Sequence, residues 1–475
     1  MWPRTLASCS ASAIRDPSTD QGALALKALF LIPGTGDFHC GSCLRDQALL
    51  RGLAALGWQV RALPLYLPWV TDTPEHAPPA GPIFFGGIST YLDATLGGST
   101  WLPGIVRRAL DHPALLRCAA RWSHLTQPGD VGRLSVSMTE HAAQAHGREI
   151  RRLARWIERD GRPDVLCLSN SLLLGLGAEL ARRLDAPLVC SMQGEDAFIE
   201  QLPEPWCGRS WAAIRRRLPA VAALVAPSRF YAQHMAEFLG CDPERIAVVP
   251  NGIAVDDPPP RAVCATDASV TSDRGPRVGY LARMHPSKGL DRLADAWIEL
   301  RSQPQWAGAD LVVAGARTRA DGLYVERIQR QLADAGLGDS VRWQANVTYA
   351  EKCEMLQGLT ALCVPVTIPE AFGLYVIEAW RAGVPVVVPG VGAMPELCSI
   401  GGGWCYDPAE RGALARCLAE ALSDPAAARA FGQRGRAAVL ERFTDRHMAR
   451  GFSRVLDAAV AGGGAPVPAG ADDRT

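Results

Sequence analysis

Short apolar runs alternate along most of the chain with longer stretches in which apolar residues recur every three or four positions. The first pattern is typical of strands buried on both faces of a sheet, and the second is typical of helices with one buried face. In the first half of the chain, the runs that we assign to strands are Ala28–Ile32, Val60–Leu65, Asp164–Leu168, Pro187–Ser191, Ala223–Ala226 and Ile246–Val249. Because strands that alternate with helices pair in parallel, an α/β fold is expected.

The alternation breaks at residues 256–276, which are rich in Pro, Asp, Thr and Ser, and we interpret this segment as a linker. The strands expected beyond it are Val278–Leu281, Leu311–Ala314, Val341–Trp343, Ala361–Val366 and Val384–Val388. Since 475 residues are too many for one compact core, two domains are predicted, residues 27–255 and 277–440. Residues 1–26 and 461–475 show neither pattern and are predicted to be a disordered extension and tail.

Composition narrows the classes of function. Lys and Arg together number 49, as do Asp and Glu, so no basic field exists to attract nucleic acid. No apolar run approaches the about 20 residues that a membrane-spanning helix needs. The 14 cysteines are scattered through predicted core strands, and residues 1–26 contain no apolar segment like that of a secretory signal. These features predict reduced thiols and a cytoplasmic protein.

The segment Pro369–Glu378 reads P-E-A-F-G-L-Y-V-I-E and joins a predicted strand to a helix. Unpaired N–H groups and the positive end of the helix dipole gather at such a helix start, which suits phosphate or polar sugar oxygens. Glu378 follows Glu370 by eight positions, so the two carboxylates can bind two parts of one ligand. A capping acid followed by an ordinary exposed glutamate is the alternative interpretation.

A second candidate segment, Val278–Leu290, reads V-G-Y-L-A-R-M-H-P-S-K-G-L. The predicted strand ends at Leu281, Arg283 and Lys288 follow in a loop, and Gly289 opens a helix. A planar guanidinium and a compact ammonium suit a diphosphate at a helix N-terminus. Without other information, two cations in a loop are usually solvated surface residues.

Together the two segments resemble the donor site of family 4 glycosyltransferases, most strongly over residues 276–400. The segment Val248–Ile253, V-V-P-N-G-I, is similar to the end of the first domain in that family. The resemblance implies the GT-B fold, in which two Rossmann-like domains face each other across a cleft. It also implies a retaining, metal-independent reaction, a nucleoside diphosphate sugar as donor substrate with no further cofactor, and a helix at residues 441–460 that crosses back to the first domain.

The resemblance also assigns roles to residues. Arg283 and Lys288 would neutralise the diphosphate in place of a metal ion, so no metal site is expected. Glu370 would hold sugar hydroxyls, and Glu378 would bind the ribose. The other donor contacts that the resemblance implies are Gly34, Gly36, Gly315, Asn346, Phe372, Gly373 and Leu374. The acceptor, a saccharide or a lipid-linked molecule, would bind to the first domain.

Polar clusters follow three predicted strands of the first domain: Ser169-Asn170-Ser171, Gln193-Gly194-Glu195-Asp196 and Ser228-Arg229. Ligands of open parallel sheets bind beyond the carboxyl ends of the strands, so Asn170 and Gln193 are expected to face the cleft. Glu195 or Asp196 could bind an acceptor hydroxyl, and capping of their own loop is an equally supported role. Many family members carry a histidine near Gln193, and its absence leaves the acceptor chemistry open.

The loop after the first strand contains two further motifs. Gly34 and Gly36 begin a G-x-G pattern, but His39 occupies the third glycine position of a dinucleotide site, which argues against a nicotinamide cofactor. Cys40 and Cys43 form a C-x-x-C at a helix start, where a redox dithiol would lie. A zinc site would need two more ligands, and no second C-x-x-C is present. Shaping of the acceptor loop is the interpretation that we prefer.

Other functions of the same fold stay open, namely a nucleotide-sugar epimerase, a phosphorylase and a non-catalytic sugar-nucleotide-binding protein. The complete set of Arg283, Lys288, Glu370 and Glu378 favours a transferase. The donor base, the sugar and the acceptor are not determined by the sequence. Basic residues in the predicted helix near residues 107–117 also leave peripheral contact with anionic lipid open, although a solvated helix face is the expectation.

Overall fold

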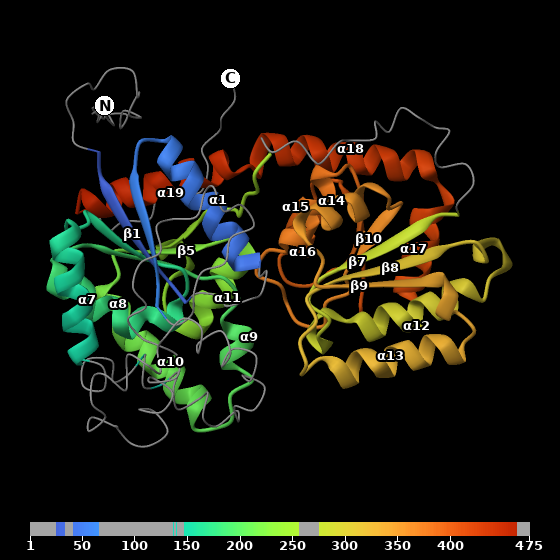
Figure 1. The fold of residues 1–475 in the computed structure, drawn as a ribbon, viewed down its shortest axis with the longest axis horizontal. Coiled ribbons are helices and arrows are strands. Elements are labelled where there is room, and N and C mark those ends of the chain that lie inside the picture. The colour runs from blue at the N-terminus through green and yellow to red at the C-terminus, as the bar shows by residue number, and fades with distance from the viewer. Residues whose placement is uncertain are drawn as a thin grey trace, which may run out of the picture.

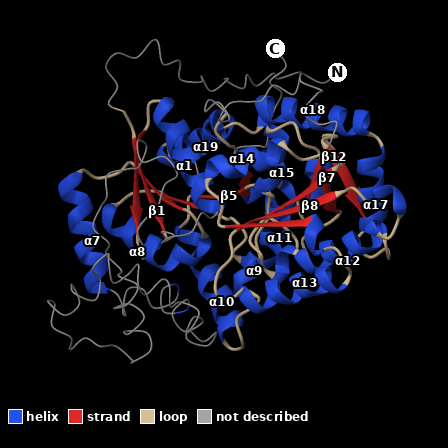
Figure 2. Ribbon diagram, turned by 45° about the vertical axis from the view of Figure 1, so that its right-hand side comes forward, coloured by secondary structure: helices blue, strands red, loops and turns tan. Residues whose placement is uncertain are grey.

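The computed structural model describes residues 25–33, 41–65, 147–255 and 275–462, together with Val136 and Thr139. The predictions for Gly34, Gly36, Cys40 and residues 107–117 therefore lie outside the described residues. Two parallel sheets form the framework, and Figures 1 and 2 show helices on both sides of each sheet. The predicted α/β fold with two parallel sheets is confirmed.

The first sheet has the strand order β2-β1-β3-β4-β5-β6. Its strands are β1 (Lys27–Ile32), β2 (Gln59–Pro64), β3 (Val165–Leu168), β4 (Leu188–Ser191), β5 (Ala223–Ala226) and β6 (Ile246–Val248). Its helices are α1 (Gly41–Ala55), α7 (Gly147–Asp160), α8 (Leu174–Leu184), α9 (Asp196–Ile199), α10 (Trp206–Arg217) and α11 (Arg229–Leu239). Since side chains alternate along a strand, Leu29 and Leu31 pack with α7, α8, α10 and α11, while Phe30 and Ile32 pack with α1 on the opposite face.

The second sheet has the strand order β12-β11-β10-β7-β8-β9. Its strands are β7 (Arg277–Leu281), β8 (Asp310–Gly315), β9 (Val341–Ala345), β10 (Ala361–Cys363), β11 (Val386–Pro389) and β12 (Gly403–Tyr406). Its helices are α12 (Leu290–Arg301), α13 (Gly322–Asp334), α14 (Tyr349–Gln357), α15 (Leu374–Arg381), α16 (Met394–Cys398), α17 (Ala413–Ser423) and α18 (Pro425–Arg442). One apolar core, which includes the fully buried Trp297 and Trp380, joins these elements.

The strands predicted from the sequence are all present, with differences at their ends. β10 stops at Cys363, although the apolar run continues to Val366. Val364 and Val366 are buried in the loop that follows, so their apolar character reflects burial rather than strand pairing. β12 was not predicted, because it is a four-residue edge strand that starts at Gly403 and buries only alternate side chains.

The last helix, α19 (Asp445–Val460), lies beside α1 rather than on the second domain (Figure 1, Figure 2). The ring of Phe452 contacts that of Phe30, with 5.9 Å between the centroids. Arg51 of α1 pairs with Asp445 at 2.6 Å. The helix α19 is therefore part of the first domain's core. No helix in the described part of the chain is long and apolar enough to span a bilayer.

Two chain connections run side by side between the domains. Ile253 forms a parallel bridge with Thr444, through hydrogen bonds of 2.9 Å from Ile253 N to Phe443 O and from Asp445 N to Ile253 O. A Cβ atom at Gly252 would collide with the carbonyl oxygen of Thr444. Glycine at position 252 therefore allows the two connections to approach this closely.

Candidate functional site

The predicted donor residues Lys288 and Glu370 lie where the strand order of the second sheet reverses. β7 and β10 are neighbours in space, and the chain moves outward from them in opposite directions. In open parallel sheets, ligands bind in the crevice beyond the carboxyl ends of such a strand pair. Lys288 follows β7 and Glu370 follows β10, so both residues lie at this crevice.

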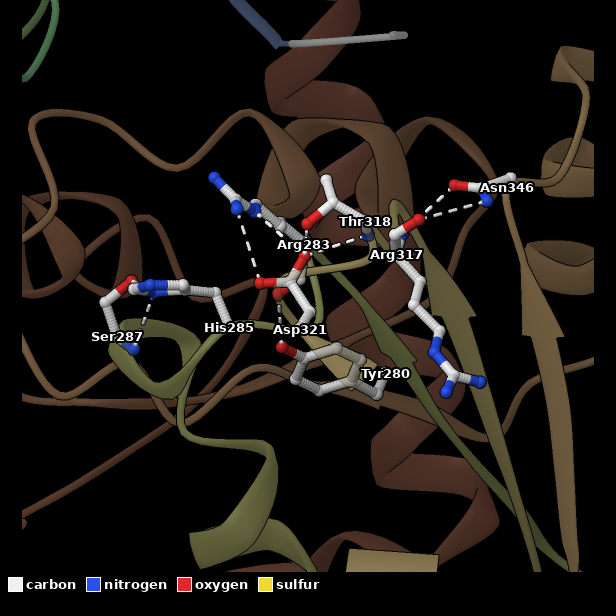
Figure 3. Close-up of polar contacts among 8 residues, drawn as sticks. All are labelled: Tyr280, Arg283, His285, Ser287, Arg317, Thr318, Asp321 and Asn346. Atoms are coloured by element: carbon white, nitrogen blue, oxygen red, sulfur yellow. Dashed lines mark hydrogen bonds and ion pairs between the residues drawn. The ribbon is translucent and has the colours of Figure 1, made fainter. Parts of the chain in front are cut away.

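The loop after β7 has a fixed shape. His285 caps a short 3-10 turn, Pro286–Lys288, and its Nδ1 accepts a hydrogen bond from Ser287 N at 3.2 Å (Figure 3). Gly289 then starts α12 with a φ of +67°, and a Cβ atom there would collide with the carbonyl oxygen of Pro365. The start of α12 thus packs directly against the segment that follows β10, and Lys288 is held next to that segment.

Lys288 and Glu370 form an ion pair between the loops after β7 and β10. Their side chains are 27% and 15% exposed, so both are partly shielded from water but reachable. The carbonyl oxygen of Glu370 accepts a hydrogen bond from Ala393 N at 2.9 Å, which fixes the backbone from the loop after β11. Gly373, with a φ of +92°, then caps α15. The two charges are therefore positioned before any ligand binds.

Arg283 is oriented by a buried carboxylate (Figure 3). Its Nε and Nη2 atoms lie 3.4 and 3.3 Å from the oxygens of Asp321, which is 3% exposed. Asp321 also accepts hydrogen bonds from the backbone N–H and the hydroxyl of Thr318, at 2.9 and 2.5 Å. The Arg283 side chain remains 49% exposed, so its outer N–H groups can reach a ligand. This contact was not predicted from the sequence, since Asp321 lies 38 positions after Arg283.

The pKa of His285 is shifted by its surroundings in this loop. Burial, and then the nearby Arg283 guanidinium, lower the pKa of His285 below its ordinary value. The ring is therefore neutral at pH 7, in agreement with a lone pair on Nδ1 that accepts from Ser287 N.

The Asn346 side chain is used within the protein. Its Oδ1 accepts from Arg317 N at 3.0 Å, and its Nδ2 donates to Arg317 O at 3.2 Å (Figure 3). Asn346 has a φ of +56°, and its N–H donates to Gly315 O at 2.9 Å. The two predicted donor residues Gly315 and Asn346 are thus brought together, and the asparagine side chain sets the shape of the loop after β8.

Glu378 on α15 is held by a lysine that sequence analysis did not identify. Lys352 of α14 donates to Glu378 Oε1 at 2.7 Å, and both side chains are largely buried. Burial acts to lower the pKa of Lys352, but the Glu378 carboxylate outweighs it, so the pKa is raised and the lysine is charged. The ammonium also lies 5.0 Å from the ring centre of Tyr349. The second carboxylate of the site is therefore also part of an ion pair.

In the first domain, the predicted acidic residues Glu195 and Asp196 form hydrogen bonds with neighbouring groups of the protein. Glu195 accepts hydrogen bonds from the N–H groups of Ser171 and Gln193, at 2.8 and 2.6 Å. Asp196 accepts from the Tyr231 hydroxyl at 2.6 Å and lies 3.0 Å from His234 Nε2. Burial, with the charges of the two acids, raises the pKa of Tyr231. These contacts give both carboxylates a role in loop shape.

Polar atoms with no partner gather at the ends of β3 and β4. The Oδ1 atom of Asn170 and the hydroxyls of Ser169, Ser171 and Ser191 are buried and bond to no other group in the described residues. Gln193 accepts from Asn251 Nδ2 at 3.1 Å. Buried polar atoms are normally hydrogen-bonded. The unpaired oxygens at the carboxyl ends of β3 and β4 are therefore available to hydrogen-bond a polar ligand.

The two halves of the site touch each other. The Ser228 hydroxyl of the first domain donates to Ala371 O at 2.7 Å, next to Glu370. Glu396 of α16 accepts from Arg229 N at 3.2 Å and Phe230 N at 2.5 Å, at the start of α11. The charged residues of the second domain therefore lie next to the polar groups at the carboxyl ends of the first sheet's strands. Such an arrangement can hold an anionic ligand on one side and a hydroxyl-bearing ligand on the other.

Family models match both domains. Residues 267–438 match the glycosyl transferases group 1, and residues 45–252 match the glycosyl transferase 4-like domain. A D-inositol 3-phosphate glycosyltransferase of Segniliparus rotundus is 31% identical over 174 residues, 36% of this chain and 38% of that relative. A glycogen synthase of Mycobacterium tuberculosis is 26% identical over 342 residues, 69% of this chain and 76% of that relative. The chain thus spans well under half the length of the first of these relatives.

Solved structures share the fold at low sequence identity. Sucrose-phosphate synthase from Thermosynechococcus elongatus has a TM-score of 0.66 at 18% identity, with 92% of this chain and 100% of that chain covered. Anabaena Alr3699/HepE in complex with UDP has a TM-score of 0.63 at 17% identity, with 91% of this chain and 100% of that chain covered. The predicted arrangement of two facing domains is the one that these proteins share.

Proposed function

The chain belongs to the glycosyltransferases of the GT-B fold, and from this premise we propose that it transfers a sugar from a nucleoside diphosphate sugar to an acceptor hydroxyl. The observation that carries the proposal is the ion pair between Lys288 and Glu370 at the reversal point of the second sheet. It brings a cation and a carboxylate side by side at the reversal point, and this supports a site for a charged sugar donor.

Arg283 and Lys288 act on the leaving group. Negative charge grows on the diphosphate oxygen as the bond to the sugar breaks, and a cation fixed beforehand stabilises that charge. Lys288 is fixed by Glu370 and Arg283 by Asp321, so neither side chain has to be ordered during the reaction. In a cleft that excludes water, such charges lower a barrier by several kcal/mol, on the order of a thousandfold in rate.

The two glutamates act on different parts of the donor. Glu370, with the backbone of Phe372, Gly373 and Leu374, holds the sugar hydroxyls, and Glu378 binds the ribose diol. Lys352 holds the Glu378 carboxylate in place through a hydrogen bond of 2.7 Å. We infer that the reaction needs no metal ion, since the two cations of the site take over the neutralisation of the diphosphate. Retention of the anomeric configuration is inferred from the resemblance to family 4 glycosyltransferases alone.

The acceptor binds to the first domain. Its proposed location is at the carboxyl ends of β3 and β4, where Asn170 and Ser171 have buried oxygens with no partner in the described residues. Hydroxyls of a saccharide, free or lipid-linked, supply the donors and acceptors that these atoms lack.

A panel of donors tests the proposal. UDP-, GDP- and ADP-sugars are added to the protein and the melting temperature is measured, since a ligand at 100 times its Kd stabilises the folded state by about 2.7 kcal/mol. At least one donor should raise the melting temperature, and Lys288→Ala should remove the shift. A panel without any shift would overturn the donor site.

Metal dependence is tested with the donor that this panel identifies. Turnover is expected to persist in excess EDTA, because Arg283 and Lys288 supply the positive charge. Loss of turnover in EDTA with recovery on addition of Mg²⁺ or Mn²⁺ would contradict this part of the proposal.

A further inference from the structure

Two cysteines lie near each other at the edge of the second domain, on α16 and on the edge strand β12. Cys398 ends α16, and Cys405 is on the edge strand β12. The Cys398 Sγ lies 4.0 Å from the carbonyl oxygen of Trp404, the residue next to Cys405. The short turn between α16 and β12 therefore brings Cys398 next to Cys405.

The two thiols differ in accessibility. Trp404 and Tyr406 on either side of Cys405 are buried, and the alternation of the strand turns Cys405 outward, where it is exposed. Cys398 is half-buried behind it. An oxidant from solvent therefore reaches Cys405 first, and Cys398 is placed to react with the product.

The two thiols also differ in acidity. The hydrogen bond with Cys398 lowers the pKa of Cys405 to about 7, and the same bond raises the pKa of Cys398. Cys405 is thus substantially a thiolate at neutral pH, the form that reacts with oxidants. By contrast, burial raises the pKa of Cys363 and of Cys417, which lie in the same core. An exposed thiolate beside a second thiol is the arrangement of redox-sensitive cysteine pairs.

We propose that Cys398 and Cys405 form a reversible oxidation site, in which a hydroperoxide converts the two thiols into a disulfide. The Cys405 thiolate attacks the peroxide oxygen, the O–O bond breaks, and the leaving oxygen takes a proton from solvent, so that a sulfenic acid and water (or an alcohol) are formed. The Cys398 thiol then attacks the sulfur of this sulfenic acid, the S–S bond forms, and a second water molecule leaves. Two electrons pass from the sulfurs to the peroxide, and an external thiol reverses the change.

The disulfide would connect two elements that now only pack together. It would fix the C-terminal end of α16 to β12, and α16 carries Glu396, which binds the start of α11 in the first domain. Oxidation would thus restrain a helix that joins the domains. This inference does not depend on the proposed sugar transfer, because it rests on the thiol pair alone.

The disulfide can be detected directly by peptide mapping. Cleavage after Arg and Lys yields one peptide, residues 382–411, that contains both cysteines and no other. The whole protein is treated with hydrogen peroxide, blocked with N-ethylmaleimide, digested and analysed by mass spectrometry. The expected product is this peptide, unalkylated and lighter by two hydrogen atoms, at peroxide doses that leave the peptides of Cys363 and Cys417 alkylated. Dithiothreitol should restore alkylation at both positions.

Single variants separate the role of Cys405, which reacts with the peroxide, from that of Cys398, which forms the disulfide. In Cys398→Ala, Cys405 should be trapped as a sulfenic acid by dimedone, whereas in Cys405→Ala the remaining thiol should stay reduced. Alkylation of Cys405 should speed up as pH rises through about 7 in the wild type, because the thiolate fraction grows there, and at higher pH in Cys398→Ala. Equal oxidation of Cys398 with and without Cys405, or a pH profile that Cys398→Ala leaves unchanged, would overturn the proposal. Circular dichroism confirms that each variant is folded.

Discussion

Glu370 and Glu378 of the proposed donor site are each paired with a lysine. The two lysines differ in whether we propose that they also contact the ligand. Lys288 lies just before α12, where we propose that the diphosphate binds, so its pair with Glu370 joins two proposed ligand-binding groups. Lys352 comes from α14, and we propose only a supporting role for it. The same pairing therefore predicts different effects of mutation at the two positions.

Glu378→Gln should act mainly on donor affinity. The ribose contacts are equal in the ground state and the transition state, so KM for the donor should rise about tenfold while kcat changes little. Glu370→Gln touches the sugar, whose charge and shape change during transfer, and kcat should fall at least about a hundredfold. Binding of the free nucleoside diphosphate, measured by calorimetry, should weaken in Glu378→Gln and hardly change in Glu370→Gln. Equal weakening would mean that Glu370 is not a sugar contact.

Asp321→Asn should weaken the diphosphate contact of Arg283 without touching the ligand. The amide keeps the shape of the carboxylate but cannot hold the guanidinium by charge, so the affinity for nucleoside diphosphate should fall about five- to tenfold. Affinity for the nucleoside without phosphates should not change. Glu326→Gln is the control, since Glu326 pairs at 3.6 Å with Arg317 at the surface. Tighter diphosphate binding in Asp321→Asn would show that the negative charge matters more than the orientation.

At the scale of elements, glycines at two helix ends make a matched pair. Gly289 and Gly336 both have a positive φ, but a Cβ atom would collide with Pro365 O only at Gly289 and would meet nothing within 4 Å at Gly336. Gly336→Ala should cost about 1 kcal/mol of stability through backbone strain alone. Gly289→Ala should cost more and should also weaken donor binding, since the start of α12 and Lys288 have to move. Chemical denaturation and calorimetry measure the two effects, and equal losses of stability with unchanged binding would contradict this.

The sequence was informative wherever burial on both faces of a sheet makes a strand continuously apolar, as in β3, β4 and β11. It was less informative for β12, where only alternate side chains are buried. The partners of Glu378 and Arg283 were missed because they lie 26 and 38 positions away in the chain. Only the folded arrangement of helices brings them together. Local pattern thus predicts elements and the loops between them, while ion pairs between loops depend on tertiary structure.

At the scale of the whole molecule, the domains are joined near the site as well as at the chain connections. Removing the contacts of Ser228 and Glu396 by Ser228→Ala with Glu396→Gln should let the two domains move apart, because these hydrogen bonds, each of about 1 kcal/mol, join the domains beside Glu370. Small-angle scattering without ligand should show a larger radius of gyration. Thr348→Ala is the control, since Thr348 caps α14 within one domain. An unchanged radius would mean that other contacts hold the cleft closed.

The position of α19 has a consequence for the exchange of parts between relatives. The helix is the last in the described chain, yet its residues Met448, Phe452 and Leu456 fill the core beneath β1. The first domain is therefore encoded in two separate blocks of sequence, with the whole second domain inserted between them. A chimaera with a single crossover at residues 256–274 would combine one parent's sheet with the other parent's α19. A hybrid that keeps an intact core needs a second crossover near Thr444, where the two connections meet.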